Sequence, residues 1–233
     1  MTRLSLVIPC FNEEGNLPAL VAACAELTRA SDCEVVLVEN GSGDGSRDRM
    51  ASLVQAHERV RAVMLQANAG YGGGILAGLR AARGAIIGWT HADLQTDPRD
   101  CLRALPLFDA EPRSFVKGLR RARPLKDVVF TWGMAAFELA VLGVPMWDIN
   151  AQPTLFPRAF FDSWEDPPTD FSLDLYAFSE AKRQGLPIQR FDVDFGDRGA
   201  GEGNNDTLAG KLRTSRRTAA FSLELRRRLR SAR

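Results

Sequence analysis

The segment His91–Pro98 places three potential metal ligands at alternate positions. His91, Asp93 and Gln95 are each separated by one residue, so in an extended chain their side chains point to one face. Imidazole, carboxylate and amide groups together suit Mg²⁺ or Mn²⁺. The spacing therefore predicts a divalent-metal site, although a polar turn closed by Pro98 would explain the same residues if the match stood alone.

Three further clusters combine polar side chains with glycines or with a helix start. Glu39–Ser46 exposes backbone donors beside carboxylates, but it lacks the Gly-Lys-Ser/Thr ending of a P-loop. Asn68–Gly74 opens a predicted helix, and its glycines would either let the backbone approach a ligand closely or form a flexible connection. Pro9–Glu14 carries an amide and two acids, which helix capping and dipole complementation explain by themselves.

Apolar runs alternate with helical patterns through the first half of the chain. Strands are predicted at residues 4–9, 34–38, 60–65 and 85–89, and helices at 16–30, 44–56 and 73–83. This alternation is typical of an α/β fold with a mostly parallel central sheet flanked by helices. Ligands of such sheets bind at the carboxyl ends of the strands, which is where the polar clusters lie.

The pattern is looser after about residue 112. A strand is predicted at 115–118, helices at 126–142 and 171–183, and a strand at 188–195. Residues 196–205 are a Gly-rich polar loop, and the basic segment that follows is helical in pattern. We therefore expect one domain over residues 1–210 and a basic C-terminal helix over 211–233.

The charge of the chain is balanced overall but not along its length. The 233 residues carry 30 basic and 29 acidic side chains, which excludes a protein dominated by nucleic-acid electrostatics. From Lys211 to Arg233, nine basic residues accompany one acid, Glu224. Leucines and a phenylalanine are interleaved with these arginines. The tail therefore suits either an anionic bilayer surface or a solvated helix packed on the domain.

Neither a signal peptide nor a spanning helix is predicted. The N-terminal apolar run is too short for a signal peptide, and no window approaches the roughly 18 apolar residues of a spanning helix. The four cysteines form no C-x-x-C pair and are interpreted as belonging to a reducing compartment. These features predict a cytoplasmic protein, peripheral on the inner face of the cell membrane if the tail binds lipid.

The clusters taken together resemble family-2 glycosyltransferases, close to the dolichyl- and polyprenyl-phosphate sugar synthases. In chain order the matches are Pro9–Glu14 to P-x-Y/F-N-E-E, Glu39–Ser46 to D-D-G-S-x-D-G-S, Asn68–Gly84 to the Gly-rich helix start, His91–Pro98 to D-A-D-L-Q-x-x-P, Val116–Arg120 to V-x-G-S-R, Asp148–Phe156 to D-x-x-x-G-F-x-L-F, and Arg198–Gly203 to R-x-x-G-E-S. Each motif is weak, whereas the ordered set is specific. The sequence departs from the pattern at Glu39, Asn40, His91, Lys117 and Leu119.

The resemblance implies a GT-A fold and a role for each matching residue. It implies that Asp93, Gln95 and His91 hold Mn²⁺ or Mg²⁺ on the donor diphosphate. The residues that it implies for nucleotide-sugar binding are Pro9, Phe11, Glu13, Glu39, Asn40, Asn68, Gly70, Ala92 and Lys211. It implies catalytic roles for Asp93, Arg120, Arg198 and Asp148, and Arg120, Arg198 and Lys211 would neutralise phosphates. Stabilising the leaving diphosphate is the central demand of such a transfer.

Two kinds of acceptor fit this resemblance. A saccharide hydroxyl, as in cell-envelope polysaccharide synthesis, needs a general base, for which Asp148, Asp170 and Asp174 are the candidates. A polyprenyl phosphate needs none, because its oxygen is already ionised. The resemblance and the basic tail favour the lipid phosphate, with Asp148 and Gln152 orienting the acceptor and with Asp170 and Asp174 on a helix surface. A non-catalytic nucleotide-sugar binding protein, with a metal motif weakened by His91, is the alternative from another class.

Overall fold

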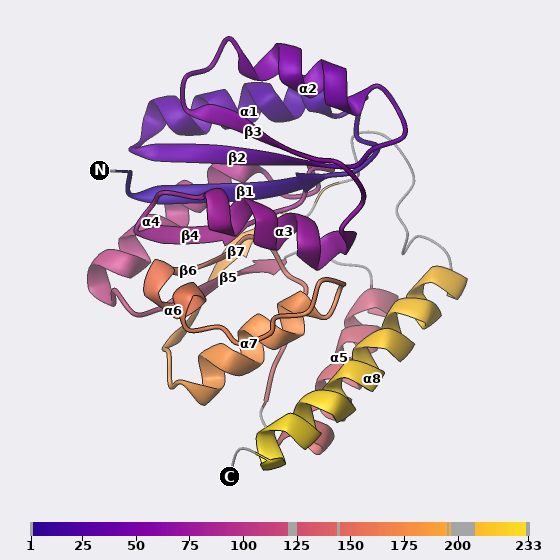
Figure 1. Cartoon of the computed structure of the whole chain (residues 1–233). Coiled ribbons are helices and arrows are strands. Elements are labelled where there is room, and N and C mark those ends of the chain that lie inside the picture. Colours follow the sequence, from indigo (N-terminus) through magenta and orange to yellow (C-terminus); the bar gives the residue numbers. More distant parts are fainter. Residues whose placement is uncertain (1, 121–124, 144, 195, 197–207, 232–233) are drawn as a thin grey trace.

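A seven-stranded sheet forms the centre of the molecule, with helices packed on both of its faces (Figure 1). The computed structural model describes residues 2–120, 125–143, 145–194, 196 and 208–231, with the backbone alone for 125–131, 134, 208–215 and 228–231. The strands are β1 (Leu4–Cys10), β2 (Cys33–Asn40), β3 (Val60–Leu65), β4 (Ile86–Trp89), β5 (Phe115–Arg120), β6 (Thr154–Pro157) and β7 (Ile188–Val193). They lie in the order β3-β2-β1-β4-β6-β5-β7.

The sheet is parallel except at β6, which runs antiparallel to both β4 and β5. The four strands expected in the first half and those near residues 115 and 188 are confirmed. Strand β6 was not predicted from the sequence. It has only four residues, and its sequence TLFP gives too short an apolar run to separate from its neighbours.

Two helical layers enclose the sheet. The helices are α1 (Leu17–Ala30), α2 (Ser46–Val54), α3 (Gly70–Ala81), α4 (Cys101–Ala110), α5 (Leu125–Leu142), α6 (Arg158–Asp162), α7 (Leu173–Arg183) and α8 (Leu208–Ser231), with a 3₁₀ turn, η1 (Pro98–Asp100), before α4. Residues of α1, α2 and α4 share one core with the sheet, and residues of α3, α6 and α7 share the other. Helix α4 was also missed, and it contains Pro106 within its span.

Alternation along the strands explains the two cores. In β1, Leu6 and Ile8 pack into the core beside α1, whereas Val7 packs into the core beside α3. Because both faces are covered, β1 and β2 are buried at nearly every position. The architecture predicted from the sequence is confirmed.

Helices α5 and α8 lie side by side, away from the sheet (Figure 1). Leu225 and Ser222 of α8 are buried, and Ser222 Oγ donates a hydrogen bond to Oε1 of Glu138 in α5 at 2.7 Å. The basic tail is therefore a helix packed on the rest of the chain, and it begins at Leu208 rather than at residue 211. None of the helices in the described part of the chain is long and apolar enough to cross a membrane.

Candidate functional site

The loops after β1 and β2 are joined by hydrogen bonds at the carboxyl edge of the sheet. Cys10 and Glu39 are register partners at the ends of these strands, so the loops start side by side. Gly43 N donates to Asn12 Oδ1 at 2.8 Å, and Gly45 N donates to Glu14 Oε2 at 3.2 Å. The first two polar clusters of the sequence therefore form one continuous surface.

Glu39 and Asn40 are buried and support this surface from beneath. Glu39 Oε1 accepts a hydrogen bond from Ser42 N at 2.6 Å, and its Oε2 lies 2.7 Å from Arg47 Nη2. Asn40 accepts from Ala69 N and donates to the carbonyl of Gly70, both at 3.0 Å. Direct contact between these two side chains and a nucleotide stays a prediction. Their polar atoms already hold the loops that would face the donor.

The other residues expected at the nucleotide site differ in exposure. Phe11 and Asn68 are exposed, Pro9 and Glu13 are partly buried, and Ala92 is buried. Glu13 Oε2 accepts a hydrogen bond from Asn16 Nδ2 at 2.6 Å. Their contacts with a nucleotide remain predictions.

The glycines that open α3 approach another part of the protein. A Cβ on Gly70 would lie 2.5 Å from the carbonyl oxygen of Thr169, and one on Gly72 would lie 2.6 Å from that of Pro168. Gly73 N donates to the Thr169 carbonyl at 2.9 Å. Close approach to a ligand was expected from Asn68–Gly74. The glycines make room for the segment before α7, and their approach to a ligand stays a prediction.

The predicted metal-binding segment is bent rather than extended. Strand β4 ends at Trp89, and Leu94 has a φ of +58°, so His91, Asp93 and Gln95 do not share the face that an extended chain would give them. Asp93 is buried, and its Oδ1 accepts from Gln95 N at 3.2 Å. Gln95 Nε2 lies 3.4 Å from the carbonyl of Gly196.

A metal ion would find only part of its coordination shell in this segment. The described side chains contain no group of three His, Cys, Asp or Glu residues that could surround a metal. Asp93 offers a carboxylate and His91 an imidazole nitrogen, which suit a divalent cation. The residues present thus fit an ion that takes its remaining ligands from a bound diphosphate.

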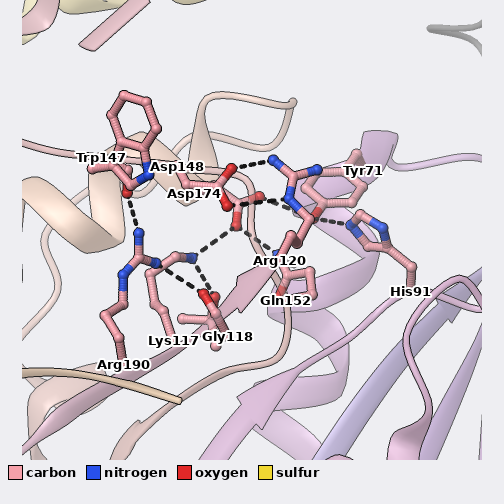
Figure 2. A network of polar contacts seen from close by, with 11 residues as sticks. Tyr71, His91, Lys117, Gly118, Arg120, Trp147, Asp148, Gln152, Asp174 and Arg190 are labelled. Carbon is pink, nitrogen blue, oxygen red and sulfur yellow. Dashed lines mark hydrogen bonds and ion pairs between the residues drawn. The ribbon is translucent and has the colours of Figure 1, made fainter. Parts of the chain in front are cut away.

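Asp174 is the centre of a buried polar network that joins α7 to α3, to β5 and to the segment before β6 (Figure 2). Its Oδ2 accepts from the Tyr71 hydroxyl at 2.9 Å, and its Oδ1 accepts from Gln152 Nε2 at 2.8 Å. Lys117 Nζ lies 3.7 Å from Oδ1. The expectation that Asp174 is a helix-surface residue is wrong, because α7 turns this carboxylate inward, where only 2% of the residue is exposed.

Lys117 and Tyr71 belong to this network, and sequence reasoning missed both. Lys117 is fully buried, and its ammonium donates to Thr154 Oγ1 at 2.5 Å. Burial lowers the pKa of Lys117 to about 8, and the nearby Asp174 charge opposes this shift. A lysine inside an otherwise apolar strand was the available signal. Tyr71 carried none, because its partners come from distant segments.

Tyr71 connects the network to His91. Its hydroxyl oxygen lies 3.1 Å from His91 Nε2, and its ring stacks on Phe171 with the centroids 4.5 Å apart. Burial raises the pKa of the Tyr71 hydroxyl well above its ordinary value, and the charge of Asp174 raises it further. Tyr71 therefore keeps its proton at neutral pH.

Arg120 and Asp148 form an ion pair at the end of β5. Arg120 Nε donates to Asp148 Oδ2 at 3.2 Å, and Nη2 contacts Oδ1. Asp148 is buried and has a φ of +49°. Arg120 was expected to contact phosphate rather than to form a surface ion pair. In the structure its guanidinium is held by a carboxylate, so any phosphate contact must be made alongside this pair.

Arg198 and Lys211 were expected to bind phosphate, and Asp170 was a candidate general base. Arg198 and the side chain of Lys211 lie outside the described residues. Asp170 is partly exposed, and its Oδ1 accepts from Ser172 N at 2.9 Å. It lines a shallow groove with residues of α8. Asp170 is therefore a loop residue facing the basic helix and does not join the Asp174 network.

Comparison with known proteins shows the family to which this chain belongs. Residues 5–171 match the family Glycosyl transferase family 2, so the chain belongs to that family. The chain is 38% identical over 173 residues to the undecaprenyl-phosphate 4-deoxy-4-formamido-L-arabinose transferase of Pseudomonas aeruginosa (strain LESB58) and 46% identical over 173 residues to that of Pseudomonas paraeruginosa. Each match covers 69% of this chain and 48% of the relative, so the chain spans about half the length of these relatives.

Solved structures confirm the GT-A fold. Glucosyl-3-phosphoglycerate synthase from Mycobacterium tuberculosis superposes with a TM-score of 0.71 at 20% identity, covering 97% of this chain and 80% of the synthase. One structure of that enzyme contains Mn²⁺, UDP and glucosyl-3-phosphoglycerate, with the same TM-score, identity and coverage.

Proposed function

We propose that this protein transfers a sugar from a nucleoside-diphosphate sugar to a polyprenyl phosphate. Family membership supports the transfer, and the names of the Pseudomonas relatives support the lipid-phosphate acceptor. The loops after β1, β2 and β4 gather at one edge of the sheet, where α/β folds bind nucleotides. This edge would receive the donor.

The observation that carries the choice of acceptor is the engagement of Asp174. Both of its carboxylate oxygens accept hydrogen bonds, one from Tyr71 and one from Gln152, and Lys117 stands beside them. A general base needs an accessible lone pair within reach of the proton that it removes. Asp174 is buried, and both of its oxygens already accept hydrogen bonds, so it is poorly placed to act as a general base. An acceptor phosphate arrives ionised and requires position and countercharge instead.

Asp93 and His91 would hold the divalent cation of the donor. When bound, such a cation stabilises the negative charge that develops on the leaving diphosphate. Asp93 keeps its carboxylate next to the donor loops, and Arg120 brings a guanidinium to the end of β5. Asp148 orients that guanidinium through the paired contacts, which limits the directions in which Arg120 can meet an anionic group.

A transfer assay with purified protein tests the proposal. Radiolabelled UDP-sugars and other nucleoside-diphosphate sugars are incubated with a short polyprenyl phosphate, with Mn²⁺ or with EDTA. We expect metal-dependent appearance of a glycolipid from one donor. Transfer to a soluble oligosaccharide but not to the lipid would replace this function with the saccharide-hydroxyl reaction. No donor consumption under any condition would favour a non-catalytic binding protein.

A further inference from the structure

Three residues form a chain of hydrogen bonds that ends at the first residue of the His91-Ala92-Asp93 triplet. Asp174 Oδ2, the Tyr71 hydroxyl and His91 Nε2 are linked by distances of 2.9 and 3.1 Å. They come from α7, α3 and the loop after β4, so only the folded chain brings them together (Figure 2). A chain of this kind determines which atom carries each proton.

The direction of these hydrogen bonds is set at Asp174, which is their buried end. An ionised carboxylate can only accept hydrogen bonds, and Asp174 Oδ1 is paired with the Lys117 ammonium at 3.7 Å. A tyrosine hydroxyl has one proton. Because Tyr71 donates that proton to Asp174, it can meet His91 Nε2 only with an oxygen lone pair. The reverse orientation would bring two acceptors together at 2.9 Å and leave the carboxylate unsatisfied at that oxygen.

We propose that Asp174 and Tyr71 are positioning residues that hold His91 as the Nε2–H tautomer and so leave its Nδ1 lone pair to bind a divalent cation beside Asp93. A neutral imidazole carries one proton, so protonation at Nε2 makes Nδ1 the acceptor. Hydrogen bonds to the far nitrogen of a metal-binding histidine commonly fix its tautomer and its ring orientation in this way. The identity of the ligand, a cation held with the donor, rests on the proposed function. The tautomer of His91 does not.

The arrangement accounts for a departure from the family motif. Histidine stands where the D-A-D-L-Q motif has its first acid, so the segment loses a negative charge. A fixed, unprotonated Nδ1 supplies a ligand atom in its place. Packing also holds the Tyr71 and His91 side chains in place. The Tyr71 ring stacks on Phe171 and meets the His91 ring edge-on, with 5.8 Å between their centroids.

The tautomer can be measured without donor, acceptor or metal. The chain has two histidines, so a His57→Gln variant leaves a single imidazole in long-range ¹H–¹⁵N correlation spectra of the protein. At pH 7, where Lys117 keeps its charge, we expect neutral His91 to be protonated at Nε2 and unprotonated at Nδ1. A wild-type His91 protonated at Nδ1 would overturn the inference. Absence of sugar transfer with the expected tautomer present would count against the proposed function alone.

A second measurement tests whether Tyr71 affects the affinity for a divalent cation. Tyr71→Phe removes the acceptor of Nε2 but keeps the ring, and Mn²⁺ binding is titrated by the EPR signal of the free ion. We expect at least a tenfold weaker affinity, in the range found for lost outer-shell partners. Tyr176→Phe is the matched control, because Tyr176 is the other tyrosine and its hydroxyl donates to the Glu165 carbonyl. Equal Mn²⁺ affinity in Tyr71→Phe and Tyr176→Phe, both folded by circular dichroism, would contradict the role of Tyr71.

Discussion

Arg120 donates to both carboxylate oxygens of Asp148 across 28 residues of sequence. The pair joins the end of β5 to the segment that leads into β6, next to the buried Asp174 network (Figure 2). Asp148 is 3% exposed, so this is not a solvent-screened surface pair. The pair instead fixes a guanidinium at the carboxyl end of the sheet.

Replacing Arg120 by lysine should reduce activity. An ammonium cannot reproduce the paired contacts of a guanidinium with a carboxylate or a phosphate. We expect Arg120→Lys to lower kcat/KM at least tenfold, about 1.4 kcal/mol. Arg103→Lys is the control, because Arg103 forms an exposed pair with Asp100. Arg120→Lys with the kcat/KM of that control would show Arg120 to be dispensable.

Removing the charge of Asp93 should abolish turnover while the fold survives. Asp93 is the carboxylate retained in the triplet, so Asp93→Asn should lose turnover by orders of magnitude at saturating Mn²⁺. The same substitution at the exposed Asp109 should leave the rate unchanged. Thermal unfolding of both variants checks their folding. Near-wild-type turnover in Asp93→Asn would remove the metal assignment.

The contact between α5 and α8 should depend on pH through Glu138. Burial raises the pKa of Glu138 from its ordinary value near 4.5 to about 7, and the Ser222 hydrogen bond opposes the shift. Between these values the folded protein keeps a proton that the unfolded chain has lost, so stability falls as pH rises from about 4.5 to about 7. Glu138→Gln should lack this component and exceed the wild type in stability at pH 8.

Denaturant unfolding at pH 5, 6, 7 and 8 measures that dependence. Glu26→Gln is the control, since Glu26 is an exposed partner of Arg99. A Glu138→Gln profile parallel to the wild type across this range would contradict the assignment of the buried carboxyl.

Binding to anionic vesicles should require arginines of α8. Deleting the tail would expose α5, because Leu225 and Ser222 are buried between the elements, so charge removal is the cleaner test. Arg216 and Arg217 are exposed, and the double change to glutamine should weaken sedimentation with phosphatidylglycerol vesicles. High salt should mimic the loss, since charges are screened over about 8 Å at physiological ionic strength. Equal binding by an Arg59→Gln/Arg113→Gln control and this variant would contradict a specific role for α8.

A methyl group at Gly72 should destabilise the protein. Its Cβ would lie 2.6 Å from the Pro168 carbonyl and 2.8 Å from that of Asp170, and neither backbone atom can move freely. We expect Gly72→Ala to lower the unfolding free energy by about 1–3 kcal/mol, as overpacking does. Gly133→Ala meets no atom within 4 Å in α5 and should stabilise the helix by about 0.5–1 kcal/mol. The two changes should shift Tm in opposite directions. A higher Tm for Gly72→Ala would show that the segment before α7 moves to accommodate the methyl group.

The amino-acid sequence by itself determined the alternating strands and helices of the first half and the edge of the sheet at which the polar loops lie. Both follow from local information, because periodic apolar residues specify each element and parallel strands share one carboxyl edge. The ordered motifs added the family, which residues 5–171 confirm. Local patterns did not reveal β6, because four residues are too few for a periodic signal.

Only the tertiary structure decided which way the chemically important side chains face. Asp174 is exposed or buried according to how α7 packs, and the packing turns it toward Tyr71, Gln152 and Lys117. Tyr71 and Asp174 are 103 residues apart, a separation over which no sequence spacing predicts a hydrogen bond. The bend at Leu94 likewise redirects the chain after Asp93, and His91 Nε2 lies against Tyr71, which comes from a distant helix. These relationships depend on contacts between distant segments, and such contacts exist only after the sheet and its helices have packed.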